Sequence, residues 1–342
     1  MDFIFNLFSS GIDALFDYLS AHVITCLVPA FFIAGGLAVF ISAPAVLKYF
    51  GPQANKFLSY GVASVSGSIL AVCSCTVLPL FAGIYKRGGG IGPATAFLFS
   101  GPAINILAIT YSARLLGWDI GIARAGAAVF LAVVIGLIMA YLFSKGAENQ
   151  ASPELFTNED SDDKPLWQTL LFFGSMVGIL IFASAANWPV TIVLLAALGL
   201  VLWRFFNIDE IKNWLKETWS FVKLITPWLI GGVFLAGVIK AVIPTDIITG
   251  AVGSSNLASN ALASVFGAFM YFATLTEVPI LKAFLELGMD KGPALALLLA
   301  GPALSLPSML VIRKIMGNKR AFTYVGLVAV SSTFAGLIFG MI

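Results

Sequence analysis

Ten long runs of apolar residues, separated by short polar stretches, dominate the pattern of the chain. Each run is close to the roughly 20 apolar residues that a helix needs to cross the hydrocarbon core of a bilayer. The pattern therefore predicts an all-α, polytopic integral membrane protein. The predicted segments are Ala21–Ser42, Phe57–Gly83, Gly92–Ala113, Gly117–Phe143, Leu166–Ala186, Trp188–Phe206, Ser220–Val242, Leu257–Leu285, Gly292–Ile312 and Ala321–Ile342.

Two shorter stretches are apolar on one side only. In the first, Phe8 and Ile12 recur at helical spacing opposite Asp13, and in the second, Trp214 lies opposite Lys216. Such one-sided helices are typical of the membrane interface. We expect two interfacial helices, with ordinary linker helices beside the membrane as the alternative.

An internal repeat divides the chain. Gly67, Thr76, Pro79, Gly92-Pro93 and Gly101-Pro102-Ala103 all recur 200 positions later, without gaps. Apolar residues match by chance easily, whereas glycine and proline in register do not. The predicted division is a first membrane repeat (1–144), an acidic linker (145–165), two connecting transmembrane helices (166–206) and a second membrane repeat (207–342).

Repeats of this kind are common in secondary transporters, which place the substrate site where the halves meet. Ten full crossings would make the halves parallel, and one re-entrant segment per half would invert them. Lys and Arg concentrate on the cytoplasmic side of membrane proteins. Here Lys86 and Lys282 favour one assignment and Lys319 opposes it, so the orientation is left open.

Composition narrows the choice of partners. Residues of the hydrophobic class make up 59% of the chain and charged residues 11%, which is too few charges to cover a water-facing surface. The net charge of +2 gives no reason to expect nucleic acid, so the expected partners are membrane lipid and a small-molecule or ion substrate. No nucleotide-binding or structural-zinc motif is present, so we expect neither a cofactor nor an enzyme. Self-association is left open.

Four prolines in register predict the substrate site. A proline inside a helix frees the carbonyl four residues earlier, and in a membrane such a carbonyl persists where it is buried in protein or lines a wet cavity. Paired interruptions in the two halves point to a transport site, although proline kinks can also serve packing alone. The residues that carry this prediction are Pro79, Gly101, Pro102, Pro279, Gly301 and Pro302.

Polar residues close to these prolines are candidate ligands. Cys73 and Cys75 precede Pro79, and thiolates prefer soft partners such as Cu(I), Zn(II) or trivalent arsenic. On a regular helix two residues at this spacing point apart, so joint binding requires that Pro79 unwind the backbone. Thr76 and Thr276 lie beside them in the two halves, and Asn105 and Ser305 follow the Gly-Pro pairs. Packing cysteines, and asparagine that joins two helices, remain the alternatives.

Glu277 is an isolated charge within an apolar run. Acids inside membrane segments are costly and usually serve ion or proton pathways, which predicts a proton-coupling role. The alternative is that the segment ends early and Glu277 lies near headgroups, paired with Lys282.

The stretch from Cys73 to Ile109 resembles the ArsP-like predicted permease family. The matching marks are Cys73-Ser74-Cys75, Pro79, Lys86-Arg87-Gly88 and Pro102-Ala103-Ile104-Asn105, and the similarity extends over most of the chain. The resemblance implies a carrier without its own ATPase in the cytoplasmic membrane. It also implies that Cys73 and Cys75 are ligands for a soft substrate or metal, while leaving the cargo open among organoarsenicals, copper, zinc and others.

We therefore expect a secondary permease that exports a thiophilic small substrate, such as a trivalent arsenical or a soft metal species. One alternative is a permease for a small organic or inorganic anion, which would bind at the broken-helix N-termini after Gly101 and Gly301. The other is a membrane thiol-redox protein that uses Cys73 and Cys75.

Overall fold

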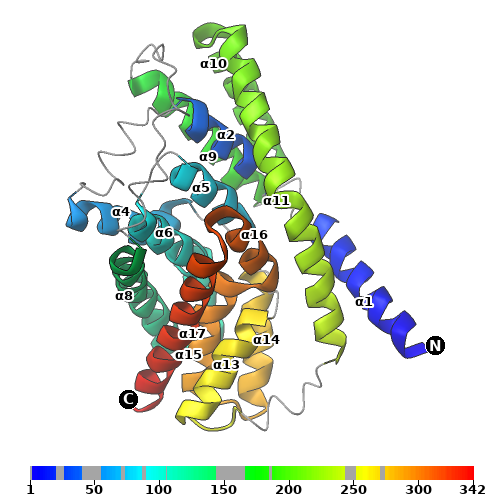
Figure 1. Cartoon of the computed structure of the whole chain (residues 1–342), viewed down its shortest axis with the longest axis vertical. Coiled ribbons are helices and arrows are strands. Elements are labelled where there is room, and N and C mark those ends of the chain that lie inside the picture. The colour runs from blue at the N-terminus through cyan, green and yellow to red at the C-terminus, as the bar shows by residue number, and fades with distance from the viewer. Residues whose placement is uncertain are drawn as a thin grey trace.

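The computed structural model describes residues 2–20, 27–40, 55–70, 74–86, 90–104, 106–143, 166–184, 187–242, 252–269 and 274–342. All regular elements in these ranges are helices, which confirms the predicted all-α fold (Figure 1). The first two helices are α1 (Asp2–Tyr18) and α2 (Val28–Phe40), and α9 (Leu166–Ser184), α10 (Trp188–Phe205) and α11 (Ile208–Val242) follow the acidic linker.

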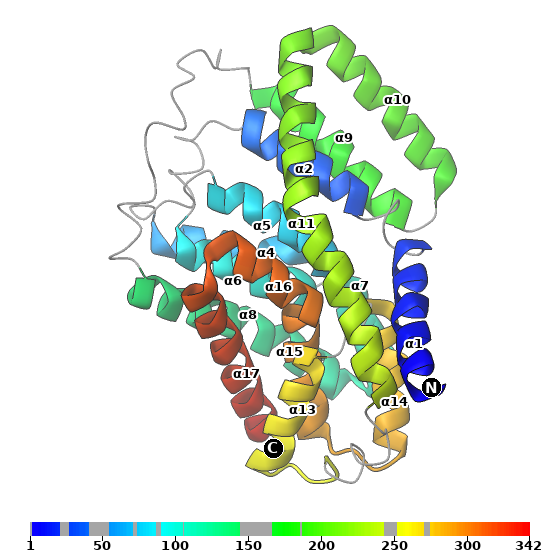
Figure 2. The same cartoon turned by 45° about the vertical axis from the view of Figure 1, so that its right-hand side comes forward.

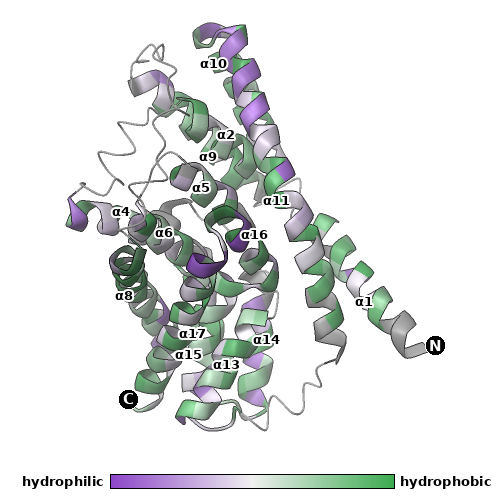
Figure 3. Cartoon of the chain, in the orientation of Figure 1, coloured by the Kyte–Doolittle hydropathy of each residue, from purple (hydrophilic) through white to green (hydrophobic). Residues whose placement is uncertain are grey.

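Several helices have the length and apolar composition of membrane spans. Within the described residues these are α8 (Trp118–Phe143), α10, the Ile208–Leu235 part of α11, and α17 (Asn318–Gly340). Two bent helix pairs raise the number from 4 to 6 if each pair is one crossing. Apolar side chains cover much of the outside of these helices (Figure 3), as expected where lipid replaces water as the solvent. The protein is a polytopic membrane protein.

The helices of the two halves begin at matching positions, again 200 residues apart to within one residue. α5 (Ser74–Lys86) corresponds to α14 (Thr274–Glu286), and α8 corresponds to α17. The remaining pairs are α4 (Lys56–Leu70) with α13 (Leu257–Phe269), α6 (Ile91–Ala103) with α15 (Lys291–Leu304), and α7 (Ile106–Leu116) with α16 (Leu306–Met316). The repeat of glycines and prolines thus corresponds to a repeat of helices, while the exact limits of the four predicted regions stay a prediction.

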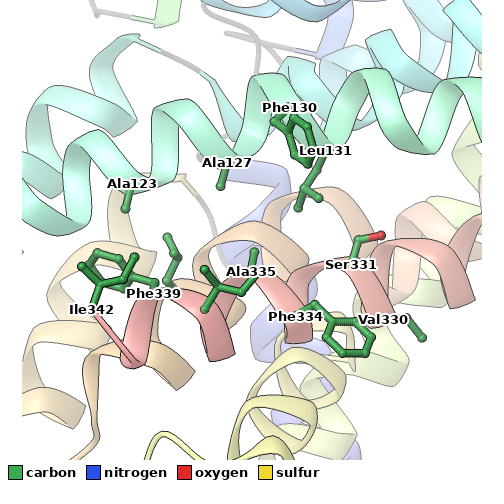
Figure 4. Close-up of a pocket in the computed structure, with 12 residues that line it drawn as sticks. Ala123, Ala127, Phe130, Leu131, Val330, Ser331, Phe334, Ala335, Phe339 and Ile342 are labelled. Carbon is green, nitrogen blue, oxygen red and sulfur yellow. The ribbon is translucent and has the colours of Figure 1, made fainter.

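The two halves are inverted relative to each other. Ala123, near the start of α8, and Phe339, near the end of α17, line the same groove. At the opposite end, Phe143 of α8 and Lys319 of α17 line another hollow. The two corresponding helices therefore run antiparallel, as Figure 4 shows along the groove between them. This resolves the question of parallel or inverted halves that the sequence left open.

Helices α6 and α15 form the centre of the molecule. Each residue of α6 is buried, as is every residue of α15 from Gly292 to Leu304. Neither helix carries a charge in these buried stretches, and both are rich in alanine and glycine. At about 1.5 Å per residue, α6 is only about 20 Å long, too short to cross a hydrocarbon core of about 30 Å alone.

Glycine pairs set the distance between these central helices and the long helices beside them. Gly92 of α6 crosses Gly136 of α8 so closely that a Cβ on Gly136 would lie 2.7 Å from the Gly92 carbonyl oxygen. In the second half, a Cβ on Gly336 of α17 would lie 2.5 Å from the carbonyl oxygen of Gly292. The two crossings occupy matching positions, so both halves use the same close backbone contact.

The predicted interfacial helices differ from expectation. The second amphipathic stretch is not a separate helix, because α11 continues from Ile208 to Val242 with Pro227 inside it. Its apolar side packs on α2, where Trp214 donates a hydrogen bond to the Phe32 carbonyl oxygen at 2.8 Å. The first stretch forms α1, which lies along α11 (Figure 2), with Phe8 in edge-to-face contact with Phe234. Each stretch therefore packs on protein in part, while Phe8, Phe16 and Trp219 remain exposed.

Besides the two segments that contain the Gly-Pro breaks, two further predicted segments are each divided into two helices. The segment Phe57–Gly83 contains α4 and α5, and Leu257–Leu285 contains α13 and α14. Pro79 and Pro279 do not mark these divisions, because each lies inside a helix, in α5 and α14. α5 begins at Ser74 and α14 at Thr274, so each proline lies one turn into its helix, where few intrahelical bonds precede it.

Candidate functional site

The candidate site is built around the break between α6 and α7. α6 continues through Pro102 and ends at Ala103, and α7 begins at Ile106. The corresponding helices α15 and α16 meet at Ser305 and are bent by 48°. The glycine and proline residues named from the sequence, Gly101, Pro102, Gly301 and Pro302, are all buried within these two helix pairs.

Arg124 of α8 reaches the end of α6 at this break. Its Nε donates a hydrogen bond to the Ala103 carbonyl oxygen at 3.3 Å, and its Nη1 donates one to Ser112 Oγ of α7 at 3.0 Å. The last carbonyls of a helix have no intrahelical donor, and the C-terminal end carries partial negative charge. The guanidinium therefore supplies both a donor and a positive charge where α6 stops.

Glu277, in the first turn of α14, completes this arrangement from the other half. Arg124 Nη2 donates to Glu277 Oε2 at 3.3 Å, and the two side chains are 0% and 1% exposed. Among the described residues, Glu277 Oε1 has no hydrogen-bond partner. The alternative pairing of Glu277 with Lys282 is wrong, because Glu277 pairs with Arg124 and Lys282 pairs with Glu286 at 4.0 Å.

The residues that match the ion pair in the repeat carry no charge. Tyr324 is the counterpart of Arg124, and Ile312 is the counterpart of Ser112. In the first half, Val77 is the counterpart of Glu277. These three residues and Ala303 are all buried and belong to one hydrophobic cluster. Among the described residues, the Tyr324 hydroxyl has no hydrogen-bond partner. The ion pair is thus a one-sided feature of a repeated scaffold.

Ser305 lies in the second break and is buried with Ser308. Their hydroxyl oxygens are 2.7 Å apart, so one donates to the other. Ser308 belongs to the first turn of α16, whose N–H groups lack intrahelical partners. Asn105, the residue that matches Ser305, lies outside the described residues.

The structure tests the thiol candidates only in part. Cys73 lies outside the described residues, and Cys75 and Thr76 belong to the first turn of α5. The backbone from Cys75 to Pro79 is helical, so the unwinding that joint thiol binding requires is not present there. Thr276 occupies the same turn of α14, and Pro79 is buried whereas Pro279 is exposed.

Sequence reasoning missed Arg124, although a signal was present. It is the one charged residue between Ile120 and Phe143, in the middle of an otherwise apolar run. The argument applied to Glu277, that an intramembrane charge needs a partner, applies equally to this arginine. That Arg124 of the first half pairs with Glu277 of the second half could be learned only from the fold.

These observations define an all-helical membrane protein of two inverted halves, with a buried ion pair between them at a helix break. The family model described as "Predicted permease" (ArsP_1) matches residues 9–341. The chain belongs to this predicted permease family and is a membrane permease. No solved structure matches it.

The curated relatives carry no substrate in their names. UPF0718 protein MJ0584 of Methanocaldococcus jannaschii is 48% identical over 361 residues, covering 100% of this chain and 98% of that protein. UPF0718 protein YraQ of Escherichia coli is 26% identical over 265 residues, covering 78% and 63%. UPF0718 protein YcgR of Bacillus subtilis is 24% identical over 134 residues, covering 39% and 45%.

Proposed function

We propose that this chain is a proton-linked secondary permease that exports a thiophilic small substrate, such as a trivalent arsenical, across the cytoplasmic membrane. The observation that carries the proton-linked part is the buried pair of Arg124 and Glu277. It joins α8 of one half to α14 of the other, where α6 breaks.

The pair has the features of a proton-dependent link between the halves. With Glu277 ionised, the two opposite charges hold α8 and α14 together in a dry site, where their attraction is strong. A proton bound at Oε1, the oxygen without a partner, removes the negative charge and leaves Arg124 with Ser112 and the Ala103 carbonyl. The halves can then separate at lower cost, which links proton binding to movement.

The two halves differ in chemistry at the same structural position, which supports a distinct cargo site. Glu277 lies in the first turn of α14, and Cys75 and Thr76 lie in the first turn of the corresponding helix α5. One half thus carries the proton-binding group, and the other carries a thiol. Thiolates favour soft ions and trivalent arsenic over hard cations.

The proton-linked part is tested with Glu277→Gln in membrane vesicles under an imposed proton gradient. We expect the variant to lose the dependence of transport on the gradient, because the amide cannot take up a proton. Glu286→Gln is the matched control, since Glu286 lies in the same helix and is exposed. Unchanged gradient dependence in the Glu277 variant, with protein at the wild-type level, would reject this role.

The cargo is tested separately. Cys73→Ser and Cys75→Ser should abolish arsenical resistance in a sensitised host while the protein still reaches the membrane. Cys26→Ser is the control, because Cys26 lies in another apolar segment. Full resistance in both test variants would reject a thiol-bound cargo.

The buried hydroxyl pair of Ser305 and Ser308 favours a second candidate, a permease for a small anion. The two hydroxyls lie at the start of α16, where free N–H groups suit an anion. On this reading Ser305→Ala and Ser308→Ala disable transport, and the two cysteine variants leave it intact. The opposite pattern would reject the anion.

A further inference from the structure

A group of oxygen atoms converges where α15 crosses α17 in the second half. Three of them lie close to the position that a Cβ on Gly292 would take: Ser255 Oγ at 2.6 Å, the Gly336 carbonyl oxygen at 2.8 Å and Asn260 Oδ1 at 3.2 Å. The largest possible separation of any two is therefore about 6 Å. The Gly292 carbonyl oxygen lies at the same crossing, beside Gly336. Figure 1 shows α13, α15 and α17, which carry three of these residues, together near the C-terminus.

Two of these oxygens have no hydrogen-bond donor. Asn260 is 0% exposed, and its Nδ2 donates a hydrogen bond to the Asn256 carbonyl oxygen at 2.8 Å, so that its Oδ1 faces the crossing. Within the part of the chain that the structure describes, neither Asn260 Oδ1 nor Ser255 Oγ has a partner. A buried acceptor without a donor is costly. The crossing therefore lacks a positively polarised group.

The corresponding crossing in the first half contains such a group. Tyr60 is the counterpart of Asn260, and its hydroxyl donates a hydrogen bond to the Gly136 carbonyl oxygen at 3.3 Å. Gly136 is the counterpart of Gly336, so the same carbonyl is present in both halves. Where the first half has a donor, the second half has one more acceptor. The shortage of positive charge is thus specific to the second half.

The chemistry of the four oxygens suits a hard, singly charged cation. They are two main-chain carbonyls, one amide oxygen and one hydroxyl, and none belongs to a carboxylate. Oxygen ligands lie about 2.3–2.6 Å from an ion of the size of calcium, so two ligands on opposite sides of it are about 5 Å apart. Sodium has this size and carries half the charge of calcium, so it needs no carboxylate to balance it. Gly336 also lies near the C-terminal end of α17, where the helix dipole favours a cation.

We propose that this crossing is a binding site for a sodium ion. The ion occupies the space left by the missing side chain of Gly292, and its ligands are Asn260 Oδ1, Ser255 Oγ and the carbonyl oxygens of Gly292 and Gly336. It supplies the positive charge that the hydroxyl of Tyr60 supplies in part in the first half. Carbonyl oxygens and helix C-terminal ends are the groups that hold sodium in secondary transporters. The inference depends neither on the cargo nor on proton coupling.

The ion stabilises the second half at a place where it contacts the first. Lys291 precedes Gly292 and forms an ion pair with Asp119 at the start of α8. Asp290 caps α15 by accepting a hydrogen bond from the Lys291 N–H at 2.7 Å. An ion held between α13, α15 and α17 fixes the start of α15, and with it the position from which Lys291 reaches the other half.

The test measures cation binding to the purified full chain in nanodiscs. Choline chloride is replaced by sodium chloride or potassium chloride at constant ionic strength, and the melting temperature and the binding of radioactive sodium are measured. We expect sodium at a hundred times its dissociation constant to raise the melting temperature by about 5 °C, because a ligand of the folded state stabilises it. Potassium should have a smaller effect, since it is the larger ion. A melting temperature that does not respond to sodium would overturn the site, and an equal shift with potassium would overturn the match in size.

Two variants test the ligands. Ser255→Ala and Asn260→Ala each remove one of the unpartnered oxygens, and each should weaken sodium binding about tenfold, the change expected when one polar contact to a charged partner is lost. Ser254→Ala is the matched control, because the Ser254 hydroxyl lies 3.2 Å from Ser259 Oγ and not at the crossing. Ser255 precedes α13, so its variant tests the site even if Asn260→Ala does not fold. Wild-type sodium affinity in Ser255→Ala, or an equal loss in Ser254→Ala, would overturn the proposal.

Discussion

The repeat itself supplies a natural template for replacing the buried ion pair. Tyr324 and Val77 occupy the positions that match Arg124 and Glu277. We therefore consider three variants, namely Glu277→Val, Arg124→Tyr and the double change. Removing one member of a buried pair usually costs about 3–5 kcal/mol, whereas replacing both by packed residues is often neutral or stabilising.

The two single variants should differ in a defined direction. Glu277→Val leaves a guanidinium that cannot lose its proton, so this variant should lose about 5 kcal/mol of unfolding free energy. Arg124→Tyr leaves a carboxyl group that can take up a proton and become neutral, so this variant should lose about 3 kcal/mol of unfolding free energy. The Ala103 carbonyl and Ser112 also lose their donor in that variant.

Thermal unfolding in detergent, followed by tryptophan fluorescence, measures these differences. At about 2 °C per kcal/mol for a chain of this size, the single variants should melt about 6–10 °C lower than wild type. The double variant should melt within about 3 °C of wild type, since it reproduces the uncharged arrangement of the other half. A double variant that loses the sum of the two single losses would refute the reasoning, because the pair would then have no mutual interaction.

Three further outcomes are expected. Gly136→Ala should lower the free energy of chemical unfolding by about 1–3 kcal/mol, because the added methyl group meets the Gly92 carbonyl oxygen. Gly126→Ala should leave it unchanged, because nothing lies within 4 Å of a Cβ there. Asp119→Asn removes the exposed ion pair with Lys291 and should change stability by less than about 1 kcal/mol. A reporter inserted in the linker (145–165) should report the cytoplasm, and one at the C-terminus should report the opposite side. Equal losses at the two glycines, a large loss at Asp119, or both reporters on one side would contradict these expectations.

The sequence predicted the helical class, the repeat and the positions of the apolar segments because each depends on local patterns. Glycine and proline at fixed spacing mark the same turns and close contacts in both halves. The division of Phe57–Gly83 into α4 and α5 was not predicted, because an apolar run has the same composition whether it is one helix or two. The continuity of α11 was missed for the opposite reason, since the pattern changes from amphipathic to wholly apolar near Ser220 while the helix continues through that change.

Orientation was unresolved from the sequence because the basic residues seemed to conflict. The hydrogen bond from Arg320 to Tyr85 removes part of this conflict, because it places the end of α5 beside the start of α17. The residue after Tyr85 is Lys86, so it lies at the same end of the molecule as Lys319. At the opposite end, Lys291 is paired with Asp119. On the positive-inside rule, the basic residues near α17 predict that this end faces the cytoplasm, which underlies the reporter prediction.

The candidate site shows how an inverted repeat acquires direction. Two identical inverted halves would present the same groups to both sides of the membrane and respond alike to a proton from either side. Glu277 has Val77 as its counterpart, and Arg124 has Tyr324, so the ion pair exists in one of the two equivalent places. Exchanging the conformations of the halves therefore yields two states that differ in electrostatic energy. On the proposed proton-linked function, proton binding to Glu277 would reduce that difference, so that the departures from the repeat would carry the coupling and the repeat would supply the two states.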